Sequence, residues 1–229
     1  MEHQRSQTTD ILPVLRTKAQ ARRLYDRISG VYGWLFGAFE NKYAEIGLMI
    51  LAVEAGEAVL EVGFGAGHCL ERIAWSVGNT GKAHGADISS GMVNATMKRL
   101  RKAGLEDRSA LLCADGASLP YRDSVFDAAF MSFTLELFDT PDIPRVLSET
   151  MRVLKPGGRL GVVSMSRENG ESIPLKLYEW AHGRWPAYLD CRPIHVERAM
   201  LDADFVTGTK KKVSLFRLPA EIVVGVKPD

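Results

Sequence analysis

Cysteine is scarce in this chain, and the thiols present are not spaced as a disulfide or metal framework. The 229 residues contain three cysteines, Cys69, Cys113 and Cys191, in no paired arrangement. An odd and sparse set of this kind is typical of reduced thiols in a cytosolic protein. His195 lies four residues after Cys191, but two ligands do not make a metal site. We therefore predict no bound metal and a cytoplasmic location.

The chain also lacks an excess of charge and a long apolar run. Lys and Arg number 29 against 28 Asp and Glu, whereas a dedicated nucleic-acid binder usually carries a basic excess. The N-terminus has no apolar core of the signal-peptide kind. The most apolar early segment, 31–53, is interrupted by Glu40, Lys42 and Glu45, so it is a poor spanning helix. These absences predict a soluble protein with no nucleic-acid partner.

The main positive signal is an alternation of short apolar runs with helical patterns, which predicts a parallel sheet covered on both faces. The last two expected strands have no helix between them and can pair antiparallel. We predict an α/β fold: a Rossmann-like, doubly wound seven-stranded sheet with the last strand antiparallel, formed by 56–229, plus an N-terminal helical cap, 1–55. The expected strands cover 58–63, 82–87, 109–115, 125–132, 159–165, 205–214 and 220–228. The expected helices cover 14–29, 40–54, 66–77, 89–104 and 142–154, the last ending at KPGG (155–158).

The loop after the first of these strands is rich in glycine. Gly63, Gly65 and Gly67 alternate with other residues there, and glycines let backbone N–H groups approach a ligand closely. A dinucleotide fingerprint would place its third glycine at position 68, which is His68. The observed spacing suits a ligand with a carboxylate and an ammonium group. Glu61 beside the loop adds negative charge, which repels phosphate and attracts a cationic amino group.

Carboxylates follow the next two strands. Asp87 ends the second strand and is placed to accept hydrogen bonds from both hydroxyls of a ribose. Asp115 ends the third strand and is available to an adenine amino group, while Ile88 and Met92 offer apolar surface to the adenine faces. A ribose partner, an adenine partner and a glycine loop without phosphate features together predict an adenosine-bearing amino acid as ligand.

Four segments carry a resemblance to a known family: VLEVGFGAG, GADISSGMV, CADGASLPYRDSVFDAAFMSFTL and RVLKPGGRLGVVSM. Over about residues 20 to 229 the chain resembles class I S-adenosylmethionine-dependent methyltransferases, and is similar to those of ubiquinone and menaquinone biosynthesis. The resemblance implies methyl transfer from S-adenosylmethionine. It also implies that Gly63, Gly65 and Gly67 hold the methionine part, Asp87 the ribose, Met92 an adenine face, and Asp115 with Gly116 the adenine edge.

The same resemblance implies roles for three further residues. Ser132, at the end of the fourth strand, would lie near the sulfonium, and Tyr25 and Tyr32 in YDRISGVYGWL would close over the cofactor. The chain departs from the family at Gly33, where an Asp is usual. It also carries FTLELF (133–138) after the fourth strand, where quinone-methylating members have a segment with an arginine, which argues against a quinone acceptor.

Each assignment has a purely structural alternative. The glycine loop is also compatible with a tight turn, Asp87 with a helix N-cap, and Met92, Tyr25 and Tyr32 with core packing. For Glu136 we expect a solvated surface charge. Glu136, His182 and His195 are the polar candidates for a base in the regions expected to face the acceptor, and we assign none of them.

We predict methyl transfer to a small or lipophilic acceptor, with three alternatives. They are a phospholipid (phosphatidylethanolamine) N-methyltransferase, an NAD(P)-dependent oxidoreductase, and a catalytically silent cofactor-binding module. The basic helix near the N-terminus, with Leu15, Leu24 and Ile28 on one side, could lie on an anionic membrane. We favour the interpretation in which this helix is a lid whose apolar side packs on the core. Peripheral contact with the inner membrane face is kept as an alternative.

Overall fold

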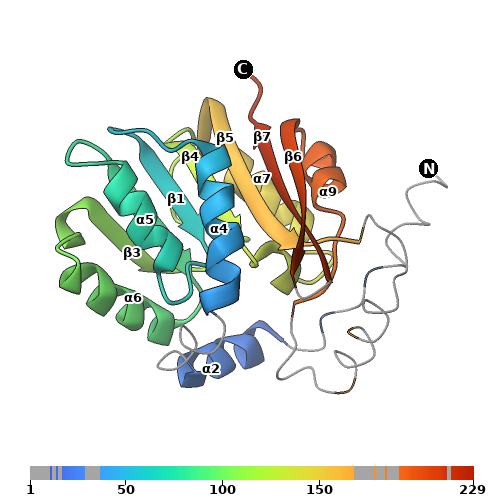
Figure 1. The fold of residues 1–229 in the computed structure, drawn as a ribbon, viewed down its shortest axis with the longest axis horizontal. Coiled ribbons are helices and arrows are strands. Elements are labelled where there is room, and N and C mark those ends of the chain that lie inside the picture. The colour runs from blue at the N-terminus through green and yellow to red at the C-terminus, as the bar shows by residue number, and fades with distance from the viewer. Residues whose placement is uncertain are drawn as a thin grey trace.

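A mixed sheet of seven strands forms the centre of the molecule (Figure 1). The computed structural model describes residues 11, 14, 17–28, 37–167, 178, 184, 191–215 and 218–229. The strand order is β3-β2-β1-β4-β5-β7-β6, and β7 runs antiparallel to both of its neighbours. This confirms the predicted seven-stranded α/β sheet with its antiparallel last strand. Tyr32, Gly33 and His182 lie outside the described residues.

The strands and helices start and end within a few residues of the predicted bounds. The strands are β1 Ala58–Val62, β2 Lys82–Asp87, β3 Ser109–Cys113, β4 Phe126–Ser132, β5 Leu154–Met165, β6 Val206–Leu215 and β7 Leu218–Val226. The helices are α2 Lys18–Ile28, α4 Gly37–Leu51, α5 His68–Ser76, α6 Ser90–Lys102, α7 Ile143–Val153 and α9 Val196–Asp202, with 3-10 turns η2 Glu106–Arg108 and η3 Leu135–Leu137. Among the described residues, no helix has the length and apolar character needed to cross a membrane.

Helices cover both faces of the sheet, because successive strand residues point to opposite sides and both sides are apolar. In β1, Val59 belongs to the core beneath α4, α5 and α6, whereas Leu60 belongs to the core beneath α7 and α9. Figure 1 shows the first group of helices on one side of the sheet and α7 and α9 on the other. The parallel strands therefore end together at one edge, which is left free for a binding site.

The segment KPGG (155–158) does not separate α7 from β5 as expected. It lies inside β5, which begins at Leu154 directly after α7. The segment bulges out of register with β4, since Phe126 pairs with Leu154 but Ala128 pairs with Arg159. The bulge is held by the C-terminal tail, where the N–H of Lys227 donates to the carbonyl of Gly158. A bulge of this kind lets an extra stretch of chain remain in a strand.

Helices α2 and α4 occupy different places although both precede the sheet. α4 lies on a sheet face, where a Cβ at Gly47 would be 2.6 Å from Cγ2 of Val163. Arg159 fixes its end, because its Nε donates to the carbonyl of Leu51 at 3.0 Å. α2 lies instead at the carboxyl edge of the parallel strands (Figure 1). Among the described residues, α2 is therefore the helix that covers this edge, and Asn41 and Ala44 of α4 also line the cleft there.

Candidate functional site

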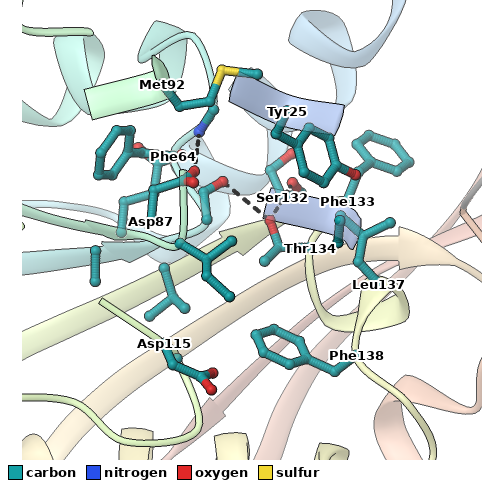
Figure 2. Close-up of a pocket in the computed structure, with 18 of the residues that line it drawn as sticks. Tyr25, Phe64, Asp87, Met92, Asp115, Ser132, Phe133, Thr134, Leu137 and Phe138 are labelled. Atoms are coloured by element: carbon teal, nitrogen blue, oxygen red, sulfur yellow. Dashed lines mark hydrogen bonds between the residues drawn. The ribbon is translucent and has the colours of Figure 1, made fainter. Parts of the chain in front are cut away.

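A cleft opens at the carboxyl edge of β1, β2, β3 and β4 and is covered by α2 (Figure 2). Its empty space is about 1430 Å³ when the open mouth and the solvent in it are included. Except for Tyr32, which is not described, and Gly67, all the predicted site residues line it. They are Tyr25, Glu61, Gly63, Gly65, Asp87, Ile88, Met92, Asp115, Gly116 and Ser132.

Two of the three loop glycines are required by close contacts within the protein. Gly63 has φ 72°, and a Cβ there would lie 2.2 Å from Cγ2 of Thr134. The hydroxyl of Thr134 donates to the carbonyl of Gly63, which ties the loop to the end of β4. Gly67 has φ 77°, and a Cβ there would lie 2.4 Å from Cγ2 of Thr96 in α6. Gly67 is the N-cap of α5 and does not line the cleft in the ligand-free protein, so its contact with Thr96 shows a packing role, and its role at the cofactor stays a prediction.

Asp87 is buried and connects two loops of the cleft. Its Oδ2 accepts a hydrogen bond from the N–H of Gly65 at 3.0 Å, and its Oδ1 accepts one from the N–H of Ser89 at 2.9 Å. The N-cap of α6 is Ser89, whose Oγ accepts from the N–H of Met92, so the alternative of Asp87 as this cap is wrong. Burial raises the pKa of Asp87, and the two N–H donors oppose this shift. Each oxygen keeps a lone pair for a ligand hydroxyl.

Glu61 is buried at the base of the glycine loop. Its Oε2 accepts no hydrogen bond from the described part of the chain. Burial and, to a smaller extent, the nearby Asp87 raise the pKa of Glu61 to about 8, although a hydrogen bond with Cys69 opposes the shift. Without a ligand, Glu61 is therefore mostly protonated at neutral pH rather than the fixed negative charge that we expected. A ligand cation beside it would favour its ionised form.

Asp115 is held from two sides. Its Oδ1 accepts from the N–H of Ala117 at 3.0 Å, and its Oδ2 accepts from Nζ of Lys18 at 2.8 Å. Partial burial opposes ionisation, but these two bonds bring the pKa of Asp115 below its ordinary value. Next to it, a Cβ at Gly116 would lie 2.8 Å from Cγ1 of Val62, so the chain passes close beneath this part of the cleft.

Met92 belongs to the hydrophobic core and also lines the cleft. It is 1% exposed, belongs to the core beneath α5 and α6, and also lines the cleft. Core packing and contact with a ligand are therefore compatible for this residue.

The opposite wall of the cleft is apolar. Figure 2 shows Tyr25, Phe133, Leu137 and Phe138 across the cleft from the two aspartates. Phe133 follows β4 with φ 49°, a left-handed conformation that is unusual for a non-glycine residue and that stores strain of roughly 1–3 kcal/mol. Its N–H donates to the carbonyl of Val163 in β5 at 2.7 Å, which keeps it in place.

Glu136 is not a solvated surface charge, as we had expected, but is fully buried in η3. Its Oε1 accepts from the N–H of Met165, and it is not among the residues that line the cleft. Arg192, which is also fully buried, interacts electrostatically with Glu136 and donates from Nε to its backbone carbonyl at 3.1 Å. The same guanidinium donates to Thr140 Oγ1 and to the carbonyl of Phe138, so it fixes the chain that forms the apolar wall.

Sequence reasoning missed Arg192, because no motif surrounds it and its partners are more than fifty residues away. Burial lowers its pKa, and Asp139 and Glu136 oppose this shift.

The histidine that reaches the cleft is His68. Sequence analysis noted it only as a departure from the dinucleotide fingerprint. Its Nε2 lies 3.0 Å from Nη2 of Arg99, and burial together with Arg99 lowers its pKa, which favours the neutral imidazole. His195, in contrast, precedes α9 and does not line the cleft. Among the described residues there is no group of three or more side chains arranged to hold a metal ion.

Comparison with known proteins gives consistent matches. Residues 59–158 match a family model described as a methyltransferase domain. The chain is 30% identical over 158 residues to 2-phytyl-1,4-naphtoquinone methyltransferase of Trichormus variabilis, covering 67% of this chain and 68% of the relative.

Solved structures show the same fold. A SAM-dependent methyltransferase from Aquifex aeolicus is 26% identical with a TM-score of 0.61, covering 80% of this chain and 89% of that one. The [4+2]-cyclase SpnF is 21% identical with a TM-score of 0.75, covering 95% and 98% of the two chains, and this likeness concerns the fold alone.

The packing role of Gly67 is testable by comparison with Gly104. Both have positive φ, but a Cβ at Gly104 meets nothing within 4 Å. Gly104→Ala should lower the free energy of unfolding by about 1–2 kcal/mol through backbone strain alone. Gly67→Ala should cost about 1–3 kcal/mol more because of overpacking against Thr96. Urea unfolding of both variants checks this, and equal losses would contradict the packing assignment.

The protonation of Glu61 predicts how stability depends on pH. Since its pKa is raised from 4.5 to about 8, the folded state holds a proton that the unfolded state releases above 4.5. The proton on Glu61 contributes fully to the free energy of unfolding at low pH. This contribution is lost as the pH rises toward the folded pKa, by at most about 5 kcal/mol. Glu61→Gln should remove this dependence. Denaturant unfolding of both proteins between about pH 5 and about pH 9 tests it, and parallel profiles would contradict it.

Proposed function

The chain belongs to the class I S-adenosylmethionine-dependent methyltransferases, and within this family we propose that it methylates a small, lipophilic acceptor without a negative charge. The observation that carries the proposal is the division of the cleft into two walls. Asp87 and Asp115 form a polar wall suited to a nucleoside, and Tyr25, Phe133, Leu137 and Phe138 form an apolar wall opposite them.

We propose the following roles in binding the methyl donor. Asp87 accepts the ribose hydroxyls, and Asp115 accepts the adenine amino group. Glu61, with its unsatisfied Oε2, receives the ammonium group beside the glycine loop. The remaining contacts come from Gly63 and Gly65 to the methionine part, Ile88, Met92 and Gly116 to the adenine, Ser132 near the sulfonium, and Tyr25 over the ligand.

The charges of the cleft support a cationic donor. The described residues that line it include four carboxylates, Asp87, Asp115, Asp139 and Asp142, against one lysine, Lys18, while Glu61 is mostly neutral until a cation binds beside it. Such an excess attracts a cation and repels a phosphate or a carboxylate. When bound, S-adenosylmethionine supplies a methyl group on a positively charged sulfur, which is a good leaving group.

The protein's own contribution is orientation and the exclusion of water. The apolar wall would hold the acceptor next to the end of β4, and proximity of this kind lowers a barrier by roughly 7–11 kcal/mol. We assign no catalytic base, because one is needed only where the acceptor atom must lose a proton. The relative from Trichormus variabilis is named for a naphthoquinone, which is in keeping with an uncharged lipophilic acceptor.

We propose that 1–55 acts as the cap and 56–229 as the donor-binding domain. In the described part of the cap, α2 covers the cleft, whereas α4 packs on the sheet and also lines the cleft with Asn41 and Ala44. The cap function is therefore shared, with α2 as the covering helix.

A second candidate acceptor is the headgroup of a phospholipid such as phosphatidylethanolamine. Arg22, Arg23 and Arg27 on α2 are exposed beside the cleft, which favours contact with an anionic lipid surface at the inner membrane face. Against it, Ala21 and Tyr25 of the same helix line the cleft, and the carboxylates there repel a phosphate. Cosedimentation with vesicles containing anionic lipid tests this candidate, and no binding at low salt would remove it.

Binding of the donor should depend on Asp87. Asp87→Asn keeps the shape but removes one acceptor oxygen, so affinity for S-adenosylmethionine should fall about 10- to 100-fold. Asp127→Asn is the matched control, because Asp127 also accepts a backbone N–H, that of Ala58, but at the opposite edge of the sheet. Calorimetry measures both variants. Equal affinities of Asp87→Asn and the wild type would contradict the site, and tight binding of NAD instead would favour an oxidoreductase.

Turnover separates an enzyme from a silent binding module, a necessary distinction since a cyclase shares this fold. The protein is incubated with cell extract and donor labelled in the methyl group, and the Asp87→Asn variant serves as the control. We expect label in a product that extracts into organic solvent. Label confined to a water-soluble anionic product, or transfer no greater than in the control, would overturn the proposal.

A further inference from the structure

Helix α2 is attached to the rest of the protein at both of its ends. At its start, Nζ of Lys18 lies 2.8 Å from Oδ2 of Asp115 and 3.1 Å from Oδ2 of Asp142. Near its other end, Oδ1 of Asp26 accepts hydrogen bonds from Oγ of Ser89 at 2.7 Å and from the N–H of Gly91 at 2.9 Å. The helix thus spans from the end of β3 to the start of α6, over the wall where we propose that the nucleoside binds.

Lys18 has an unusual place among these contacts. It is the one lysine or arginine among the described residues that line the cleft, and its partner Asp115 is the residue proposed to meet the adenine. Both oxygens of Asp115 are engaged, one by Lys18 and the other by the N–H of Ala117. A carboxylate held at both oxygens cannot turn without losing a charge-assisted hydrogen bond.

We propose that Lys18 is a positioning residue that sets the nucleobase specificity of the donor site by holding the Asp115 carboxylate toward the base. The inference rests on the proposed function, because it requires the adenine to lie against Asp115. A carboxylate accepts hydrogen bonds from the amino group of a 6-aminopurine. Against the carbonyl of a 6-oxopurine it presents oxygen to oxygen, which is repulsive.

The fixed orientation of the Asp115 carboxylate makes the difference between a 6-amino and a 6-oxo group matter for binding. A mobile carboxylate would rotate away from the carbonyl of a 6-oxopurine and relieve the repulsion. A carboxylate pinned by Lys18 and Ala117 keeps the repulsion, and discrimination against an unwanted ligand depends on such built-in penalties. Removing the Lys18 ammonium should therefore weaken rejection of the 6-oxopurine more than it weakens binding of the 6-aminopurine.

The test compares two ligands that differ only in the base, S-adenosylhomocysteine and S-inosylhomocysteine. Their dissociation constants are measured by calorimetry at fixed ionic strength for the wild type, Lys18→Met, Lys18→Arg and Arg23→Met. Arg23 is exposed on the same helix, so its variant removes one positive charge without touching Asp115. We expect Lys18→Met to lower the adenosyl-to-inosyl preference about fivefold, the size expected for one partly exposed charge-assisted bond. Arg23→Met should keep the wild-type preference, and Lys18→Arg should restore most of it.

A double-mutant cycle with Asp115→Ala shows whether Lys18 acts through Asp115. We expect Lys18→Met to have no further effect on the preference in the Asp115→Ala background. An unchanged preference in Lys18→Met, including the case where both ligands weaken equally, would overturn the inference and leave the proposed function standing. If Lys18→Met changed the adenosyl-to-inosyl preference equally in the wild-type and Asp115→Ala backgrounds, the inference would likewise be overturned and the proposed function would stand. Failure of the wild type to bind S-adenosylhomocysteine would overturn both proposals. Circular dichroism confirms folding, which should persist because the side chain of Lys18 is 44% exposed.

Discussion

One buried carboxylate holds the binding edge of this fold together. Asp87 accepts hydrogen bonds from the N–H groups of Gly65 and Ser89, so it joins the loop after β1 to the start of α6. The loop is fixed from the other side as well, because the hydroxyl of Thr96 in α6 donates to the carbonyl of Gly65. Burial of Asp87 favours its neutral form, and the two N–H donors favour its charged form. The side chain that we propose to bind the ribose is therefore also the one that holds the loop in place.

Most of the fold was predictable because its signals are local in the chain. Short apolar runs mark the buried strands, and parallel strands must end at a common edge, so polar residues at strand ends meet in space. Asp87 and Asp115 were placed correctly for that reason. The bulge at 155–158 was missed, because it depends on pairing with Lys227, which lies about seventy residues further along the chain. No local sequence pattern indicates a pairing partner that far along the chain.

The site was predictable in part, and the features that were missed share a cause. Gly67 has the spacing of a ligand-binding glycine, and its contact with Thr96 adds a packing role that the spacing did not predict. Glu136 has the character of a surface charge, but it is buried, where its carboxylate accepts from the N–H of Met165 and interacts electrostatically with Arg192. In both cases the neighbour that matters lies about thirty or more residues away. Residue type and spacing identify which side chains can bind a ligand, whereas distant contacts decide how each of them packs.

The electrostatics of the cleft suggest where rate acceleration comes from. A site rich in carboxylates favours a cation, and methyl transfer converts a cationic sulfonium into a neutral thioether. The carboxylates stabilise the full positive charge of the bound donor. In the transition state this charge has already decreased, so the carboxylates stabilise the transition state less than the starting state and do not lower the barrier. Under the proposed function, orientation of the acceptor by the apolar wall then supplies most of the acceleration. The chain that carries Leu137 and Phe138 of this wall is held by the buried guanidinium of Arg192. A buried charge outside the cleft would thus serve the proposed reaction by fixing the shape of an uncharged surface.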